Sequence, residues 1–274
     1  MYRIGAFYCQ IAAGIAEAGM RDVEETFNYA RSHGITEIDF NSKEINDSTA
    51  AMLKNCGMHA ASVHGAAPCE FETREKYLES LDFMKRAIDK AVAIGSPYFM
   101  NVPQPPKDMS PDKHGDLVKA IREQFSDLCE YAKQLPITVT VEDFSTDAVP
   151  YATFEDIDYL LENNPSLMFT YDSGNFPLAG IDEAEGAKRY ADRTIYVHLK
   201  DLKVVENEGI LRRGVYYDSL ELGGGYLKNL ESLKILKNAG FTDGVITIEV
   251  NSSFDRLSRT IKSVDWLKSA IANI

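Results

Sequence analysis

Short apolar runs rich in β-branched residues alternate with longer amphipathic runs along the whole chain. The short runs predict eight strands, at Arg3–Phe7, Glu37–Phe40, His59–Val63, Tyr98–Val102, Thr138–Glu142, Leu167–Tyr171, Ile195–Leu199 and Val245–Glu249. The amphipathic runs predict eight helices, near Asp22–Ser32, Asp47–Asn55, Thr73–Ile94, Asp116–Gln134, Thr153–Glu162, Asp182–Ala191, Leu227–Asn238 and Phe254–Ala270. Such regular alternation is typical of βαβ units with parallel strands.

Eight consecutive βα units predict an α/β fold, a single (β/α)8 TIM barrel, because that number of units closes a barrel more readily than it forms an open sheet. Periodicity alone leaves a doubly wound sheet of similar size open. No Pro/Ser-rich linker and no repeat divides the chain, so residues 1–274 are predicted to form one domain with its site at the carboxyl ends of the strands. The longest irregular stretch, Asp201–Gly225, follows the seventh predicted strand, and we interpret it as a lid or substrate loop.

The chain of 274 residues has a formal net charge of −13. Affinity for nucleic acid comes largely from Lys and Arg, and anionic membranes also attract basic surfaces, so we expect neither as a partner. Four cysteines without CxxC spacing do not suggest a disulfide scaffold, and the N-terminal stretch fits neither a secretory signal nor a spanning helix. We therefore expect a cytoplasmic protein that acts on a small molecule.

Four of the later strands carry a carboxylate or an imidazole at their carboxyl ends, directly after an apolar run. The motifs ITVTVEDF, MFTYDSGN, IYVHLKD and VITIEVN place Glu142, Asp172, His198 and Glu249 at these positions. In a barrel, side chains at the carboxyl ends of the strands point into one shared mouth. Because an unpaired charge is costly to bury, four such residues together need a cation. Three carboxylates and an imidazole suit Mn²⁺, Mg²⁺ or Co²⁺ better than a metal that prefers thiolates.

With LGGGY and the ending NAGFTDGVITIEVN, these motifs make the chain resemble the xylose isomerase-like superfamily of sugar isomerases and epimerases, which includes inosose dehydratases and apurinic endonucleases. The resemblance covers nearly the whole chain. It implies one divalent metal ion bound by Glu142, Asp172, His198 and Glu249, with Mn²⁺ as the first expectation and Mg²⁺, Co²⁺ or Zn²⁺ as alternatives. It also implies a small sugar or polyol substrate and a homodimer or homotetramer.

In such epimerases the two metal-bound glutamates also move the proton. The resemblance therefore assigns proton abstraction and return to Glu142 and Glu249, while the metal polarises the carbonyl and stabilises an enediolate. The predicted function is a divalent-metal-dependent isomerase or epimerase of a small sugar or polyol carbonyl compound. The plainer alternative is that both glutamates are ligands only.

Six further residues are predicted to bind the substrate: His64, Lys200, Asn175, Asp39, Phe7 and Asn101. His64, in SVHG, resembles a recurrent family histidine that touches substrate hydroxyls, and Asp39 matches the position of an acid on the second strand of many relatives. Lys200 can hold a carboxylate, a phosphate or an oxyanion. Phe7 can form an apolar wall for a sugar ring. The stretch Asn101–Pro106, at the end of the fourth strand, places Asn101 or Gln104 within reach of the substrate.

The chain also departs from the family pattern. Asn175 stands where many epimerases have histidine, and the stretches Asp143–Ala148 and Leu202–Val205 lack the second glutamate and the arginine of ketohexose epimerases. These departures argue against a free ketohexose as substrate. Together with Lys200 they keep an inosose-type dehydratase open, and a non-catalytic sugar-binding barrel is a third alternative. Five histidines are too few for the trinuclear zinc cluster of the endonucleases, so a DNA-repair role is not expected.

Overall fold

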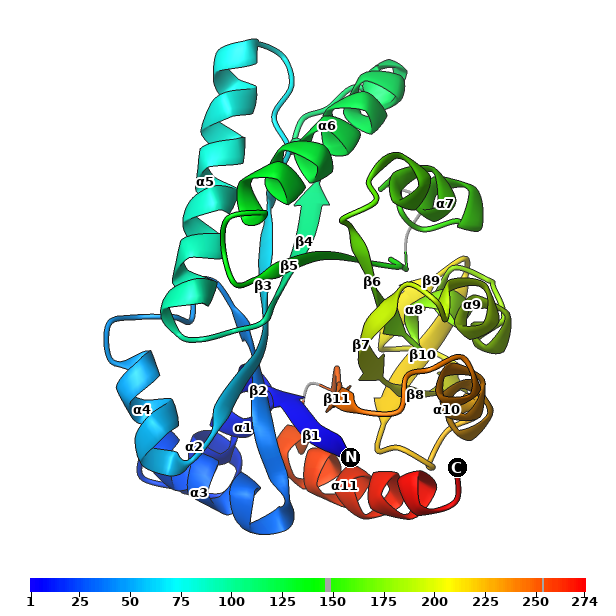
Figure 1. Ribbon diagram of the computed structural model, residues 1–274. Helices are drawn as coiled ribbons and strands as arrows, with labels where there is room; N and C mark the ends of the chain where they lie inside the picture. Colours follow the sequence, from blue (N-terminus) through cyan, green and yellow to red (C-terminus); the bar gives the residue numbers. More distant parts are fainter. Residues whose placement is uncertain (146–148, 253) are drawn as a thin grey trace.

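The computed structural model describes residues 1–145, 149–252 and 254–274. Eight parallel strands close into a barrel in the order β1-β11-β7-β6-β5-β4-β3-β2, with helices around the outside (Figure 1). The barrel strands are β1 (Tyr2–Phe7), β2 (Ile35–Asn41), β3 (His59–Pro68), β4 (Tyr98–Gln104), β5 (Thr138–Glu142), β6 (Met168–Asp172), β7 (Thr194–Leu199) and β11 (Gly244–Ile248). The predicted (β/α)8 barrel is confirmed, and the doubly wound sheet is excluded.

The helices follow the predicted amphipathic runs, with three short additions after strands, α1, α2 and α8. The helices are α1 (Tyr8–Ala12), α2 (Gly14–Glu17), α3 (Val23–His33), α4 (Thr49–Cys56), α5 (Arg74–Ala93), α6 (His114–Ala132) preceded by the 3₁₀ turn η1 (Pro111–Lys113), α7 (Phe154–Asn163), α8 (Asn175–Leu178), α9 (Glu183–Tyr190), α10 (Asn229–Asn238) and α11 (Arg256–Ala272). Asp22, Thr73, Thr153 and Asp182 start four of these helices by accepting hydrogen bonds from backbone N–H groups.

The register of the parallel strands brings their carboxyl ends level with one another. Asp172 of β6 lies beside His198 of β7, and Thr247 of β11 lies beside the same histidine. Glu142 ends β5 opposite Thr170, two residues before the end of β6. Residues far apart in the chain therefore meet at one mouth of the barrel.

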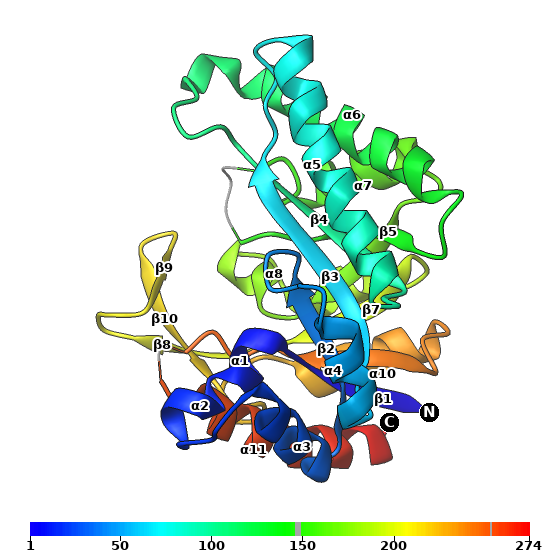
Figure 2. The ribbon, with the colours of Figure 1, turned by 90° about the vertical axis from the view of Figure 1, so that its left-hand side faces the viewer.

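The interpretation of Asp201–Gly225 as irregular is wrong. Most of this stretch forms a three-stranded antiparallel sheet in the order β8-β10-β9, with β8 (Asp201–Val205), β9 (Ile210–Arg212) and β10 (Val215–Leu220). We call this sheet the arm. It projects from the barrel on the side away from the N-terminus (Figure 2). The aromatic and β-branched residues of β10 pair with both neighbours, which stabilises strands that are too short to stand out from the sequence.

The arm is attached to the barrel at several points. At its base, the Asp201 carboxylate accepts hydrogen bonds from the backbone N–H groups of Leu202, Gly223 and Leu227. Farther out, Arg212 donates through Nε to Ser145 Oγ, 3.2 Å away, in the segment after β5. These bonds hold the arm beside the mouth of the barrel.

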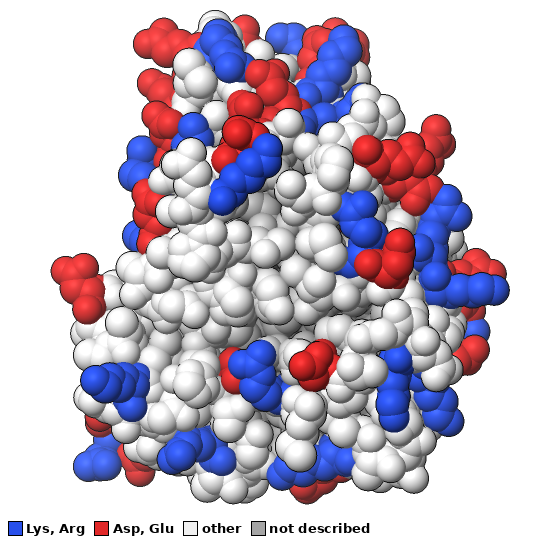
Figure 3. All heavy atoms as spheres, in the orientation of Figure 1, with Lys and Arg blue, Asp and Glu red and all other residues white. Residues whose placement is uncertain are grey.

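The face of the barrel opposite the mouth differs from the mouth in its distribution of charge. Figure 3 shows the side on which the N-terminus lies: its centre is mostly uncharged, and acidic and basic side chains alternate around the rim without a continuous basic area on this face. Within the described part of the chain, no helix is both long enough and apolar enough to cross a membrane.

Candidate metal centre

Side chains of the barrel strands form layers in the lumen, because alternate residues of a strand point to the same side. One layer contains Thr140 and Thr170, whose hydroxyls are hydrogen-bonded at 2.8 Å, together with Tyr196 and Thr247. Two residues further along the same four strands come Glu142, Asp172, His198 and Glu249. The barrel thus stacks a carboxylate and imidazole layer on a hydroxyl layer.

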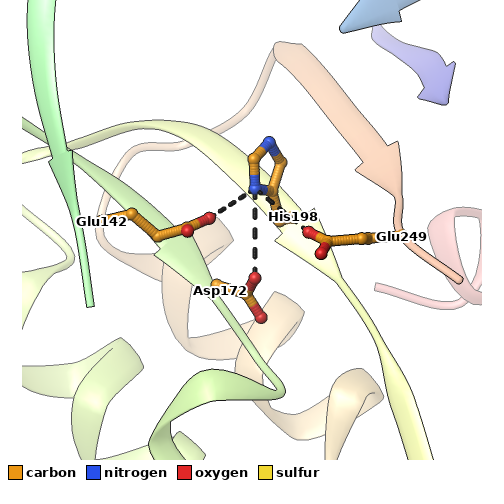
Figure 4. Close-up of side chains that lie close together, drawn as sticks. All are labelled: Glu142, Asp172, His198 and Glu249. Atoms are coloured by element: carbon orange, nitrogen blue, oxygen red, sulfur yellow. Dashed lines mark hydrogen bonds and ion pairs between the residues drawn. The ribbon is translucent and has the colours of Figure 1, made fainter. Parts of the chain in front are cut away.

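The four residues of the upper layer converge. Each offers one ligand atom, and these atoms all lie within 4.8 Å of one another. His198 Nδ1 lies 2.5 Å from Glu142 Oε1, 3.6 Å from Glu249 Oε2 and 4.0 Å from Asp172 Oδ2. Figure 4 shows the three carboxylates pointing toward this one ring nitrogen. The structure therefore brings together all four residues that the sequence predicts as metal ligands.

The other nitrogen of His198 is held by Asp39 of β2. His198 Nε2 lies 3.0 Å from Asp39 Oδ2, which also accepts a hydrogen bond from the Tyr196 hydroxyl at 2.9 Å. Asp39 Oδ1 lies 3.3 Å from His64 Nδ1. A carboxylate that accepts from one imidazole nitrogen leaves the other nitrogen free to face a metal. Asp39, predicted to bind substrate, bridges the two histidines behind the cluster.

Lys200 and Asn175 complete the polar surroundings of the carboxylates. Lys200 Nζ lies 2.6 Å from Asp172 Oδ2 and 3.1 Å from Glu249 Oε1, and it donates to Asn175 Oδ1 at 3.1 Å. Asn175 Nδ2 donates to Glu142 Oε2 at 3.3 Å. Both residues, predicted to bind substrate, bind the carboxylates of the cluster.

A buried acid beside the cluster was missed by the sequence reasoning. Asp143, only 1% exposed, accepts a hydrogen bond from the Asp172 backbone N–H at 3.2 Å through Oδ1, while its Oδ2 has no hydrogen-bond partner among the described residues. Burial, and then the charges of Asp172 and Glu142, raise the pKa of Asp143 well above its usual value. Its position directly after Glu142 was the available signal, since adjacent acids after an apolar strand are costly without partners.

Burial and charge act on the cluster in opposite ways. Burial raises the pKa of Glu142 and of Asp172, and the positive charges of His198 and Lys200 only partly offset this rise. For His198, burial lowers the pKa, but the charge of Glu142 and the hydrogen bond to Asp39 raise it well above 6.5. For Asp39, burial alone raises the pKa, yet the bonds from His198 and His64 leave it below its usual value. The cluster therefore attracts positive charge.

This donor set fits a divalent cation. The three carboxylates of the cluster outnumber the one ammonium of Lys200, which leaves an excess of negative charge in a largely buried site. Oxygen ligands with one imidazole suit Mn²⁺, Mg²⁺, Co²⁺ or Zn²⁺, and no cysteine lies in the cluster. Asp39 supplies the outer carboxylate that orients the histidine in many metal sites.

The remaining predicted site residues lie in two different places. The Phe7 ring lies 5.0 Å from the His198 ring and 5.7 Å from the His64 ring, measured between centroids, so it borders the cluster. His64, whose side chain is 19% exposed, also contacts Asn41, with Nε2 and Nδ2 3.1 Å apart. Asn101 does not join this group: its amide donates to Gln124 of α6 at 3.2 Å, which directs it toward the helices outside the barrel. Asn101, predicted to bind substrate, therefore lies apart from the other predicted site residues.

The fold and the cluster define a (β/α)8 barrel with a candidate metal centre at the carboxyl ends of its strands. Residues 13–270 match a family described as the xylose isomerase-like TIM barrel. The chain belongs to this family. A search of curated proteins found no match.

Solved structures of similar fold include proteins of sugar metabolism and metal-bound barrels. D-Allulose 3-epimerase from Methylomonas sp., solved with D-allulose, is 17% identical with a TM-score of 0.72, and 98% of this chain and 97% of that chain are covered. A protein named IOLI with a bound zinc atom is 15% identical with a TM-score of 0.74, and 99% of this chain and 97% of that chain are covered. A xylose isomerase-like barrel from Mycobacterium smegmatis, in complex with magnesium, is 14% identical with a TM-score of 0.68, and 100% of this chain and 97% of that chain are covered. At these low sequence identities, the similarity to the solved structures shows a shared fold alone.

Proposed function

We propose that this protein is a divalent-metal-dependent isomerase or epimerase of a small sugar or polyol carbonyl compound, acting through an enediolate. The observation that carries the proposal is the convergence of two glutamates, Glu142 and Glu249, with Asp172 and His198 within 4.8 Å. The family's solved structures with a sugar, with zinc and with magnesium support this class of function.

Glu142, Asp172, His198 and Glu249 would hold the metal, with Mn²⁺ our first candidate. When bound, the metal supplies positive charge that makes a carbonyl-adjacent C–H more acidic and stabilises the enediolate. In our proposal one glutamate removes the proton from the carbon next to the carbonyl, and the other returns it on the opposite face.

The surroundings of the two glutamates suit proton transfer. Glu249 is the more accessible, with 14% of its side chain exposed against 8% for Glu142. Each keeps one carboxylate oxygen engaged by a neutral amide: Asn251 Nδ2 donates to Glu249 Oε1 at 2.8 Å, as Asn175 does to Glu142. An oriented carboxylate loses less entropy when it reaches the reactive carbon. Phe7 and His64 would border the sugar, with the ring of Phe7 against its C–H face.

We propose that the substrate carries no phosphate. TIM barrels commonly bind phosphate with the loops after the last two strands and a nearby helix N-terminus. Here the backbone N–H groups of Arg256 and Leu257, at the start of α11, donate to the two carboxylate oxygens of Glu17 at 3.1 and 3.0 Å. The position is thus filled by an acidic side chain of the protein itself.

Dehydration of a cyclic keto-polyol is the second candidate function, favoured by one observation. The Lys200 ammonium is buried among the carboxylates, 3.1 Å from Glu249. After proton abstraction next to the carbonyl, a hydroxyl on the following carbon leaves as water if a nearby acid protonates it. Lys200 would be that acid, and the product would be an enone.

The experiment that tests the proposal measures metal content and turnover together. We expect about one metal ion per chain in the wild type, and none after Glu142→Gln or His198→Ala. Glu37→Gln is the matched control, because Glu37 is also buried in the lumen, at its other end beside Arg3. A panel of sugars, their phosphates and inososes with added Mn²⁺ follows. Absence of metal binding in the wild type on titration would overturn the proposal, and enone formation from an inosose would select the second candidate.

A further inference from the structure

A cavity of about 450 Å³ lies between the arm and the segment that follows β11. Its walls are the crossover between β8 and β9, the middle of β10, and residues next to Glu249. The lining residues include Asn207, Tyr217, Asp218, Ser219, Asn251 and Phe254. Pockets of this size hold small organic ligands.

The cavity adjoins the candidate metal centre through one residue. Asn251 lines the cavity, and its Nδ2 donates to Glu249 Oε1 at 2.8 Å. Its backbone N–H donates to Ser219 Oγ of β10 at 2.9 Å, so the same residue ties the arm to the cluster. Asn251 is therefore shared by the cavity wall and the surroundings of Glu249.

The chemistry of the walls suits a neutral polyhydroxylated ring. Phe254 is 60% exposed, which packing does not explain, and the Arg259 guanidinium lies 5.6 Å from its ring centroid. Phe254 and Tyr217 offer aromatic surface for the C–H face of a sugar, while Asn207, Asp218 and Asn251 offer hydrogen-bond partners for hydroxyls. Glu208 in the walls disfavours a phosphate or carboxylate group, whereas the charge of Asp218 is balanced by Lys203 at 3.4 Å and Arg259 at 3.8 Å.

The wall made by the crossover has a strained backbone. Glu208 has a φ of 61° and Gly209 a φ of 116°, and a Cβ on Gly209 would lie 2.3 Å from the Tyr217 carbonyl oxygen. A non-glycine residue at positive φ is strained, and such strain is found at ligand sites more often than elsewhere. Only glycine at position 209 allows the crossover to lie this close to β10.

We propose that this cavity is a second sugar-binding subsite, so that the substrate is a glycosylated sugar whose reducing ring reacts at the metal centre. The inference rests on the proposed function. It accounts for the absence of the residues that bind a free ketohexose, because part of the recognition is moved to the second ring.

Metal-loaded protein and three probes test the subsite: D-fructose, and the disaccharides maltulose and lactulose, which carry the same ketose with one added ring. We expect each disaccharide to bind about tenfold more tightly than D-fructose in calorimetry, with kcat/KM shifted the same way. Phe254→Ala and Asn207→Ala should remove this preference without changing D-fructose binding. Tyr29→Ala is the control, since Tyr29 is a partly exposed aromatic residue (38%) on α3.

The outcomes separate the two proposals. Turnover without a disaccharide preference, or a preference unaffected by Phe254→Ala, overturns the subsite and leaves the proposed function standing. A disaccharide preference that depends on Phe254, without turnover of any probe, supports the subsite and counts against the proposed reaction. Failure of both disaccharides to bind overturns the subsite.

Discussion

At the scale of single residues, the candidate centre depends on side chains that no ligand needs to touch. Asp39 is fully buried and contacts His198, His64 and Tyr196. Its negative charge faces Nε2 of His198, so Nδ1 is the nitrogen available to a cation. One carboxylate on β2 thereby sets the orientation of a ligand on β7.

The first prediction concerns Asp39. Asp39→Asn should weaken metal affinity by about 10-fold to 100-fold, because the amide no longer draws the Nε2 proton toward a negative charge. Competition against a chelating dye measures the dissociation constant. Tyr196→Phe, which removes a neutral donor to the same oxygen, should have a smaller effect. Equal affinities in wild type and Asp39→Asn would show that packing alone orients His198.

The second prediction concerns Lys200, whose ammonium lies 2.6 Å from Asp172. Lys200→Met should destabilise the metal-free protein by about 3 kcal/mol, because a buried carboxylate loses its partner. It should also increase the stabilisation that added Mn²⁺ provides, since a positive charge that repels the cation is gone. The increase in Tm on addition of Mn²⁺, compared between wild type and Lys200→Met, measures this stabilisation.

Lys203→Met is the control for Lys200, because Lys203 is half exposed on the arm and pairs with Asp218. Lys203→Met should change neither the stability of the metal-free protein nor the increase in Tm on addition of Mn²⁺. Loss of the Mn²⁺ effect in Lys200→Met would mean instead that Lys200 is required to hold Asp172 in place.

At the scale of elements, the carboxyl ends of strands and the start of α11 decide what the mouth can bind. The residue before α11, Asp255, has a φ of 55° and its side chain makes no capping hydrogen bond. Glu17, at the end of α2, caps the helix in its place. An element early in the chain thus completes the last helix.

The third prediction follows from this cap. Glu17→Ala should lower the free energy of unfolding by about 1 kcal/mol, because two backbone N–H groups lose their acceptor. Glu17→Gln should keep about half of that stability, since its amide oxygen still accepts one hydrogen bond. Urea denaturation of the three proteins gives the comparison. An alanine variant as stable as the wild type would show that water replaces the carboxylate without loss.

At the scale of the whole molecule, the main core extends through helices and barrel, and it encloses three thiols, that of Cys56 among them. Cys69 after β3 and Cys129 on α6 are both buried. Burial raises the pKa of each of these two thiols from 9.0 to about 12. The folded state therefore keeps these protons at a pH where the unfolded chain has lost them.

The fourth prediction gives the sign of the pH dependence. The stability associated with each thiol is fully present below pH 9 and is lost as the pH rises toward 12, with a slope of up to about 1.4 kcal/mol per pH unit. Cys69→Ala and Cys129→Ala should each flatten this alkaline decline, measured by urea denaturation from pH 7 to 10.5. Below pH 8 the slopes of all three proteins should coincide. A decline equally steep in the variants would assign it to the tyrosines.

Much of this protein follows from local sequence patterns. Apolar runs of period two and amphipathic runs of period 3.6 predict the barrel because those periods arise from backbone geometry alone. Glu142, Asp172, His198 and Glu249 could be found because each follows an apolar strand, where an unpaired charge requires an explanation. Tyr196 could have been found in the same way, since it lies two residues before His198 on the same face.

Only the tertiary structure decided which polar residues meet. Asp39 contacts His198 because closure of the barrel brings β2 opposite β7 across the lumen. Asn101 lies outside the mouth because side chains alternate between the two faces of β4, and its side chain lies on the face toward α6. The arm and its cavity also escaped the sequence, because three short strands owe their stability to pairing with one another and to Asp201, Ser145 and Asn251. The physical reason is that local patterns record the conformation of a segment, whereas contacts across the barrel depend on strand register and closure.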